Sequence, residues 1–333
     1  MHISLSLPKK ILAWYDNNKR KLPWRVSKKS PKKVYYRLLS EFMLQQTQVK
    51  TVIPYFNNFT KKFRTLESLS KSNDKEILKM WEGLGYYRRA RNLLKCSKHL
   101  VKYYDSKLPK TLEEIKKLPG VGDYTGNALL GLVHDKPRIA VDGNVKRVFS
   151  RNLNKEESEI NFVEFIKKNQ KKLFSTNRNA DFVEALMEFG ALVCKPKNPN
   201  CLTCCLNKTC NYFKSSNKIE GTRKKMIKNR NYDIFCYVNK KRQIALKKNK
   251  QISFLKNFNI PAIKETIDLK NNQEWKFLKH YKNTISNLKL NINLYYKFSD
   301  KIPPSYRWYS LERNKEFIPS FTKKIFRQVS TLF

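Results

Sequence analysis

Hydrophobic residues recur with the period of an α-helix through roughly the first two thirds of the chain. In the clearest stretch they are spaced by three and four residues, which places one apolar stripe on a helix: Phe182, Ala185, Leu186, Phe189 and Val193. The pattern predicts successive amphipathic helices from about residue 34 to 193. Glu184 and Glu188 fall outside this stripe. Such carboxylates usually belong to a solvated face, with a role in a site as the alternative.

The pattern changes near residue 233. The runs 233–238, 243–246 and 288–294 are short or alternating, which is typical of strands. A polar, basic stretch precedes them and is typical of an inter-domain linker. Because hydrophobic cores usually stop growing near ~250 residues, we expect two domains. These are a mainly α part over residues 1–213 and, after a linker over 214–232, a smaller α/β part over 233–333.

The charge balance points to a polyanionic partner. The chain has 70 Lys and Arg against 27 Asp and Glu, a formal net charge of +43, and nucleic acid is the obvious partner. AT-rich codon usage alone can produce many lysines, so charge by itself does not decide the partner. No apolar run approaches the ~18 residues of a membrane helix, and the N-terminus lacks the pattern of a secretory signal. We therefore expect a cytosolic protein with no membrane partner.

Five of the seven cysteines fall between positions 194 and 210. Disulfides do not persist in a reducing compartment, so this clustering indicates a metal site. Four of the five have a spacing that matches neither a zinc ribbon nor a ferredoxin run: Cys194, Cys201, Cys204 and Cys210. Their chemistry leaves zinc and an iron–sulfur cluster open. The alternative of scattered buried thiols requires the five to gather by chance. Cys205 is either a spare thiol or a competing ligand.

Several further segments contain candidate chemistry. Gly120 and Gly122 form a hairpin that ends at a helix start, where free N–H groups suit a phosphate; a plain connection is the alternative. Asp142 stands at a helix start, where an N-cap is the alternative to a catalytic role. Desolvation by large apolar neighbours favours the protonated form of Glu41, although a helix-surface Glu is commoner. The segment 81–89 carries aromatics, glycines and arginines that suit insertion into a base stack, or an aromatic-anchored turn.

Together these motifs closely resemble the adenine DNA glycosylases, which are helix-hairpin-helix base-excision enzymes. The resemblance covers roughly residues 20 to 213, and its motifs occur in the family's order: LPWR at 22–25, SEFMLQQT at 40–47, GLGYY at 83–87, LPGVG at 118–122, VDGNVKRV at 141–148 and the cysteine loop at 194–210. It implies a [4Fe-4S] cluster on the four cysteines, with a structural and DNA-related role. It also implies a monomeric, nucleoid-associated enzyme that removes adenine mispaired with 8-oxoguanine or guanine from double-stranded DNA.

The resemblance also implies roles for single residues. N-glycosidic hydrolysis needs one acid for the leaving base and one carboxylate for the cationic sugar. Glu41 matches the general acid and Asp142 the cation-stabilising group, while Tyr124 and Asn144 match their supports. The other matches are binding positions: Gln46 and Tyr86 as duplex wedges, Trp24, Arg25 and Glu184 in the wall of the adenine pocket, Thr47 and Leu84 near the 8-oxoguanine, and the hairpin glycines Gly120 and Gly122.

Tyr124 separates the possible activities. Endonuclease III-like enzymes carry a lysine there, whose amine forms the Schiff base behind strand cleavage. We therefore expect a monofunctional glycosylase rather than an enzyme for oxidised pyrimidines. A non-catalytic DNA-binding module is the other alternative, but such a module needs none of the four catalytic matches.

Residues 233–333 resemble, more faintly, a Nudix-like domain that reads 8-oxoguanine. Ile285-Ser286-Asn287 stands where the family has Phe-Ser-His, which keeps only Ser286 as the hydrogen-bonding residue. Phe258-Asn259-Ile260-Pro261 departs from the expected Trp-x-Phe-Pro, and Cys205 replaces a usual Pro. We expect a weakened preference for 8-oxoguanine over guanine. The acidic metal-binding box of Nudix hydrolases is absent from the sequence, so we expect no nucleotide pyrophosphatase activity.

Overall fold

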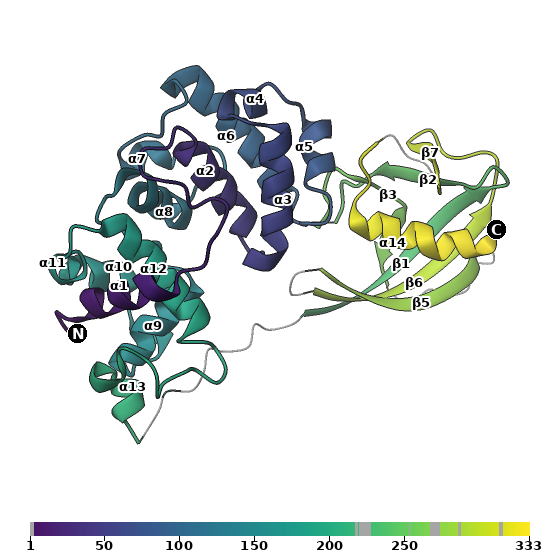
Figure 1. The fold of residues 1–333 in the computed structure, drawn as a ribbon. Coiled ribbons are helices and arrows are strands. Elements are labelled where there is room, and N and C mark those ends of the chain that lie inside the picture. The colour runs from purple at the N-terminus through teal and green to yellow at the C-terminus, as the bar shows by residue number, and fades with distance from the viewer. Residues whose placement is uncertain are drawn as a thin grey trace. The chain divides into compact units, whose positions relative to one another are not determined.

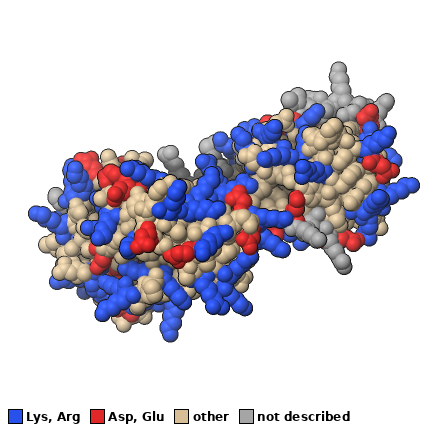
Figure 2. Space-filling model, turned by 90° about the horizontal axis from the view of Figure 1, so that it is seen from above, with Lys and Arg blue, Asp and Glu red and all other residues tan. Residues whose placement is uncertain are grey.

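The computed structural model forms two compact units. It describes residues 3–216, 219, 228–252, 254–266, 274–285, 288–312 and 316–333. One unit comprises Met1–Met80 and Tyr86–Arg223, and the other comprises Trp81–Gly85 and Lys224–Phe333. The first is helical and the second is built on a sheet (Figure 1). Lys and Arg side chains spread over the face of both units that Figure 2 shows, in keeping with the net charge of +43.

The predicted succession of helices is confirmed in the first unit. Its helices are α1 (Leu7–Asn18), α2 (Lys33–Leu44), α3 (Val49–Lys62), α4 (Leu66–Ser70), α5 (Asp74–Met80), α6 (Arg88–Tyr104), α7 (Leu112–Ile115), α8 (Asp123–His134), α9 (Gly143–Leu153), α10 (Phe162–Lys168), α11 (Gln170–Leu173), α12 (Asn179–Leu192) and α13 (Asn211–Lys214), with the short 3₁₀ helices η1 (Glu157–Glu159) and η2 (Asn207–Thr209). Helix α12 packs against α1, α8 and α9. The predicted apolar stripe of α12 is buried in the core there.

The second unit contains a mixed seven-stranded sheet. Its elements are β1 (Lys228–Asn239), β2 (Gln243–Lys248), β3 (Asn259–Ile260), β4 (Ala262–Glu265), β5 (Lys276–Ile285), β6 (Leu288–Phe298), β7 (Tyr306–Ser310), α14 (Ser320–Val329) and η3 (Ser330–Leu332). The strands run in the order β3-β2-β1-β6-β5, with β4 beside β1 and β7 beside β2. The three predicted strand runs are confirmed. Strand β1 begins at Lys228, so the end of the stretch expected to be a linker is strand.

Helix α14 covers one face of this sheet (Figure 1). Side chains alternate between the two faces of a strand, so Ile234, Cys236 and Val238 of β1 point to the same face. They form a core with Phe321 and Ile325 of α14. The odd-numbered residues of β1 therefore belong to the opposite face.

Candidate active site

Glu41 lies in the last turn of α2, enclosed by the helical unit. The residue is 5% exposed, and its Oε2 atom has no hydrogen-bond partner within the described part of the chain. Burial raises the pKa of Glu41 to about 7, the positive charge of Arg37 opposes this rise, and Glu184 and Asp142 add to it. The prediction that desolvation favours the protonated acid is confirmed.

Asp142 is the N-cap of α9, as one of the two sequence interpretations expected. Its Oδ1 accepts from the Val145 backbone N–H at 2.7 Å, and its Oδ2 accepts from Asn144 Nδ2 at 2.9 Å. Burial raises the pKa of Asp142, and these two hydrogen bonds limit the rise. The cap therefore does not exclude a second role, because it fixes a half-buried carboxyl in one orientation.

Tyr124 brings the two acids into one site. Burial raises the pKa of its phenol well above the usual value, and the charges of Glu41 and Asp142 raise it further. The phenol, in the first turn of α8, is thus close enough to both carboxyl groups for their charges to act on it. Two carboxyls in one desolvated site do not ionise together easily. The arrangement suits one protonated acid beside one carboxylate.

A buried arginine on α9 supports Asp142 indirectly, through Asn144. Arg147 donates to Asn144 Oδ1 at 2.8 Å, to the Gly190 carbonyl at 2.7 Å and to the Cys194 carbonyl at 2.7 Å. A Cβ on Gly190 would lie 2.7 Å from the Cβ of Asn144, so only glycine lets α12 approach so closely. The sequence analysis missed both Arg147 and Gly190. The available signals were an arginine inside the motif at 141–148, to which no role was given, and a glycine inside an apolar helix.

The carboxylate of Glu184 is held by three groups. Tyr15 donates to its Oε2 at 2.5 Å, Arg25 Nε lies 3.2 Å from the same oxygen, and Arg37 pairs with Oε1. Arg37 was not singled out from the sequence, although it precedes Glu41 by one helical turn on α2. Arg25 and Glu184 also line a cavity of about 610 Å³.

Glu188 is the second carboxylate that the sequence analysis left on a solvated face. It is 2% exposed and pairs with Arg20 Nε at 3.0 Å and with Arg25. Glu184 is 8% exposed. The usual interpretation, a solvated face, is therefore wrong for both, and the alternative of a role in a site is the one that their burial leaves open. Arginines before and within α2 neutralise them, so both charges stay buried.

Trp24 takes a different place from Arg25. Its side chain is 3% exposed and meets the ring of Phe56 edge-on, with 5.3 Å between ring centroids. The structure brings Arg25 and Glu184 together and places Trp24 in the core beside α3.

Two exposed residues of the helical unit have left-handed backbones. Gln46 has a φ of 59° and Tyr86 a φ of 48°. This conformation costs roughly 1–2 kcal/mol without glycine and gathers at functional sites. Arg89 ties both segments together, because it donates to Thr47 Oγ1 at 3.0 Å and to the Met43 carbonyl at 2.8 Å, while its guanidinium lies 5.3 Å from the Tyr86 ring centroid.

The two glycines of the hairpin before α8 have different surroundings. Gly120 has a φ of +81°, and a Cβ there would lie 2.6 Å from the Cβ of Asn92. Gly122 has no atom within 4 Å of such a Cβ. Gly120 is thus required by the fold, whereas Gly122 keeps open space before the helix.

Leu84, expected near the 8-oxoguanine, is 6% exposed, and Ser286 lies outside the described residues.

The four predicted cysteine ligands line one common cavity between α9 and the 194–210 loop. The Leu206 backbone N–H donates to Cys204 Sγ at 3.4 Å, and Arg151 Nη1 lies 3.6 Å from Cys194 Sγ. Cys205 packs against the same core as Cys194 and Cys204, and its thiol adjoins that of Cys204. Within the residues that the structure describes, no group of three or more His, Cys, Asp or Glu is arranged to hold a single metal ion.

Comparisons with known proteins show the family of the chain. Residues 39–169 match the HhH-GPD superfamily base excision DNA repair protein. The adenine DNA glycosylase of Buchnera aphidicola subsp. Baizongia pistaciae is 37% identical over 311 residues, covering 88% of this chain and 86% of that protein. The adenine DNA glycosylase of Homo sapiens is 36% identical over 207 residues, covering 60% of this chain and 38% of that protein.

Solved structures agree with the fold. A thermostable thymine-DNA glycosylase aligns with a TM-score of 0.56 at 27% identity, covering 62% of this chain and 95% of that one. A trapped endonuclease III–DNA covalent intermediate aligns with a TM-score of 0.52 at 22% identity, covering 64% of this chain and 98% of that one, which shows the fold alone.

No helix among the described residues is long and apolar enough to span a membrane.

Proposed function

This chain belongs to the adenine DNA glycosylases, and from that membership we propose that it excises adenine paired with 8-oxoguanine or guanine in double-stranded DNA. The observation that carries the proposal is the meeting of Glu41, Asp142 and Tyr124 in one desolvated site. A protein that only bound DNA would gain nothing from burying an unpartnered carboxyl group, because burial of a polar group without a partner costs stability.

The proposed chemistry divides the work between the two acids. Adenine first leaves the base stack, at a cost of a few kcal/mol. Glu41, whose pKa is about 7, donates its proton to a ring nitrogen of adenine. The C1′–N9 bond then breaks, and its electron pair leaves with the base. The carboxylate of Asp142, fixed by Val145 and Asn144, stabilises the cationic sugar until water adds at C1′ and gives a proton to the Glu41 carboxylate.

The remaining strand stays intact in this proposal. Strand cleavage by the endonuclease III route needs a lysine amine that attacks the sugar, and position 124 carries a tyrosine. Its raised pKa keeps the phenol protonated. Tyr124 therefore serves as a neutral hydrogen-bonding support of the two acids.

The DNA contacts follow from the same unit. We propose that Gln46 and Tyr86 wedge the duplex, supported by their exposure and left-handed backbones. The open space at Gly122 leaves the start of α8 accessible to a phosphate. In this proposal Arg25 and Glu184 form the wall of the adenine pocket, together with Trp24, the residue before Arg25. Thr47 and Leu84 lie toward the 8-oxoguanine.

We propose that Cys194, Cys201, Cys204 and Cys210 hold a [4Fe-4S] cluster. Four thiols around one cavity fit the four-cysteine ligand set of such a cluster, and backbone N–H groups that point at the sulfurs are typical of it. A zinc ion would require the four to converge on a single point. When bound, the cluster would fasten the loop to α9. In this proposal Cys205 is the spare thiol next to Cys204.

The sheet unit would supply the preference for the opposite base. We propose that it is a Nudix-like reading domain, that its discrimination between 8-oxoguanine and guanine is weakened by Ile285 and Asn287, and that Ser286 makes the remaining contact. The enzyme would act as a monomer on nucleoid DNA in the cytoplasm.

Single-turnover assays on duplexes test the function. Adenine opposite 8-oxoguanine and adenine opposite guanine should both yield alkali-dependent cleavage, and thymine glycol should yield none. Asp142→Asn should reduce the rate at least ~100-fold, as loss of one preorganised electrostatic contact does. Asn at this position can still cap α9, so folding is preserved.

Two results would contradict the proposal. One is an Asp142→Asn protein as fast as the parent. The other is strand cleavage before any alkali or heat, which would indicate an endonuclease III-like enzyme. Iron and sulfide analysis of the purified protein tests the cluster separately.

A further inference from the structure

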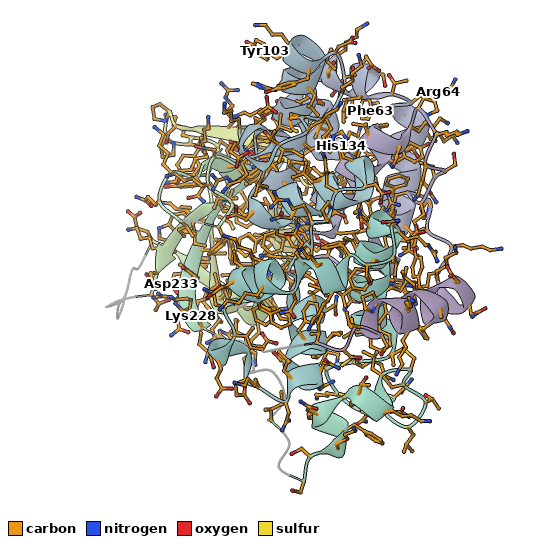
Figure 3. All side chains as sticks on the ribbon, turned by 90° about the vertical axis from the view of Figure 1, so that its left-hand side faces the viewer. Phe63, Arg64, Tyr103, His134, Lys228 and Asp233 are labelled. Carbon is orange, nitrogen blue, oxygen red and sulfur yellow. The ribbon has the colours of Figure 1, made fainter. Side chains whose placement is uncertain are left out.

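The face of the sheet opposite α14 carries aromatic side chains from β1, β5 and β6. Parallel pairing of β1 with β6 sets Phe235 beside Tyr295, and antiparallel pairing of β5 with β6 sets Phe277 beside Tyr295. Asp233, labelled in Figure 3, belongs to the same face of β1. The helices described within 228–333 are α14 and η3, and both pack on the other face. Described helices therefore leave this face uncovered.

Aromatic rings gather on this face in contact with one another. The rings of Phe235 and Tyr295 stack with 5.3 Å between centroids, and Phe277 lies 5.6 Å from Tyr295. Trp275 and Tyr306 extend the group through contacts with Tyr237 at 4.8 Å and 5.6 Å. We call this set the aromatic platform: Phe235, Tyr237, Trp275, Phe277, Tyr295 and Tyr306.

The platform is open at Phe277. This ring is 57% exposed, which is costly for a large apolar group unless a partner covers it. Phe277 contacts Tyr295, which stacks on the buried ring of Phe235. Aromatic side chains that are already packed lose less conformational entropy when a ligand binds.

Exposed lysines lie beside the platform, together with the exposed carboxylate of Glu274 at its rim. Lys247 Nζ lies 5.2 Å from the Tyr306 ring centroid. The register places Lys282 opposite Asn291 and Lys264 opposite Asp233, so both exposed lysines share this face. The carboxyl of Asp233 is only 1% exposed. At the rim, Glu274 is paired with Lys297 at 3.1 Å.

A row of polar side chains adjoins the rings. Asn293 Nδ2 donates to Asp233 Oδ1 at 2.8 Å, and His280 Nδ1 shares a hydrogen bond with Asn293 Oδ1 at 3.0 Å. Asp233 Oδ2 has no partner in the described part of the chain. The row stands one residue pair along β1 and β6 from Phe235 and Tyr295. Polar groups so close to the rings do not suit an apolar protein helix.

We propose that this face binds unpaired nucleotides of single-stranded DNA. Bases stack on Phe277 and Tyr295, the phosphates meet Lys247, Lys264 and Lys282, and His280 offers a hydrogen bond to a base edge. Aromatic rings among basic side chains on an open sheet are the combination that binds single strands with little sequence preference. The site goes beyond the proposed excision, because it requires neither a mispair nor an extruded adenine.

Fluorescence anisotropy with a labelled oligothymidylate of about 15 nucleotides tests the site on the full chain. This oligonucleotide contains no adenine, so excision does not enter the measurement. At raised salt, phosphate contacts weaken while stacking persists. Phe277→Ala should lower the affinity roughly tenfold, the loss expected for one stacked base. Phe298→Ala is the matched control, because Phe298 is 48% exposed and lies on the α14 face of β6; its affinity should equal that of the parent.

Photo-crosslinking of the bound oligothymidylate locates the contact directly. Crosslinked peptides from β5 or β6 would support the proposal even if a variant folded poorly. Equal affinity of Phe277→Ala and the parent, or crosslinks only in the helical unit, would overturn it and leave a protein partner for this face. Repeating the titration with Asp142→Asn separates the two hypotheses, because single-strand binding should survive even where excision is abolished.

Discussion

The helical unit and the sheet unit handle buried polar groups in opposite ways. In the helical unit, Glu184, Glu188 and Arg147 are each more than nine-tenths buried, and each has several partners. In the sheet unit the buried carboxyl of Asp233 has one amide partner, and the core beside α14 is apolar. Charges that stay ionised inside a protein need partners, whereas Glu41, with a pKa raised to about 7, is buried with no partner for its Oε2 among the described residues. A sheet core needs only an alternating apolar pattern.

The two units also differ in which residues can be substituted without loss of the fold. The HhH-GPD match at 39–169 lies almost wholly in the helical unit, and the proposed excision requires Glu41 and Asp142 to keep their relative positions. In the sheet unit the face toward α14 builds the main core, while the opposite face also carries exposed residues. Residues such as Phe277 on the other face can change without loss of the fold, so that face can acquire its own ligand.

The largest expected effect is a loss of stability when a buried arginine of the helical unit is replaced, compared with an exposed arginine of the sheet unit. Arg147→Met should lower the free energy of unfolding by about 3 kcal/mol or more, because it leaves buried carbonyls and Asn144 without a donor. Arg230→Met is the counterpart on the sheet, where an exposed pair with Glu265 at 2.7 Å should contribute under about 1 kcal/mol. Denaturant unfolding followed by circular dichroism measures both. Similar losses in the two variants would erase the contrast between the units.

A second prediction uses the buried acid of the helical unit. The pKa of Glu41 rises on folding from its ordinary 4.5 to about 7. Its stabilising contribution is therefore complete below pH 4.5 and is lost as the pH rises through 7. Glu41→Gln cannot ionise, so at pH 8 it should be more stable than the parent by up to about 3 kcal/mol.

Urea unfolding near pH 4.5 and at pH 8 makes this test. The two proteins should agree at the lower pH and separate at the higher one. The exposed Glu113 supplies the control, because Glu113→Gln should not change the difference between the two conditions. Equal stability of Glu41→Gln and the parent at pH 8 would show that the acid is not desolvated.

The smallest effect concerns packing in the hairpin of the helical unit. Gly120→Ala should cost about 2 kcal/mol, since the left-handed φ and the contact with Asn92 both oppose a Cβ. Gly122→Ala meets open space and should stay within about 0.5 kcal/mol of the parent. Thermal melts compare the pair. A larger loss at Gly122 would mean that the hairpin is packed differently.

The sequence by itself determined the features that depend on local patterns. The period of apolar residues predicted the helices and three of the strands, because each periodicity fits one backbone geometry. The apolar neighbours of Glu41 predicted its protonated state, and the position of Asp142 before a helix predicted its cap. The ordered motifs identified the family.

Only the tertiary structure decided which distant groups meet. Glu184 receives its hydrogen bond from Tyr15, and Glu188 pairs with Arg20, across more than 160 residues of chain. A carboxylate outside an apolar stripe has the same local pattern whether water or an arginine faces it. The parallel pairing of β1 with β6, the early start of β1 and the uncovered aromatic face were hidden for the same reason. Partners brought together by folding leave no periodic trace along the chain.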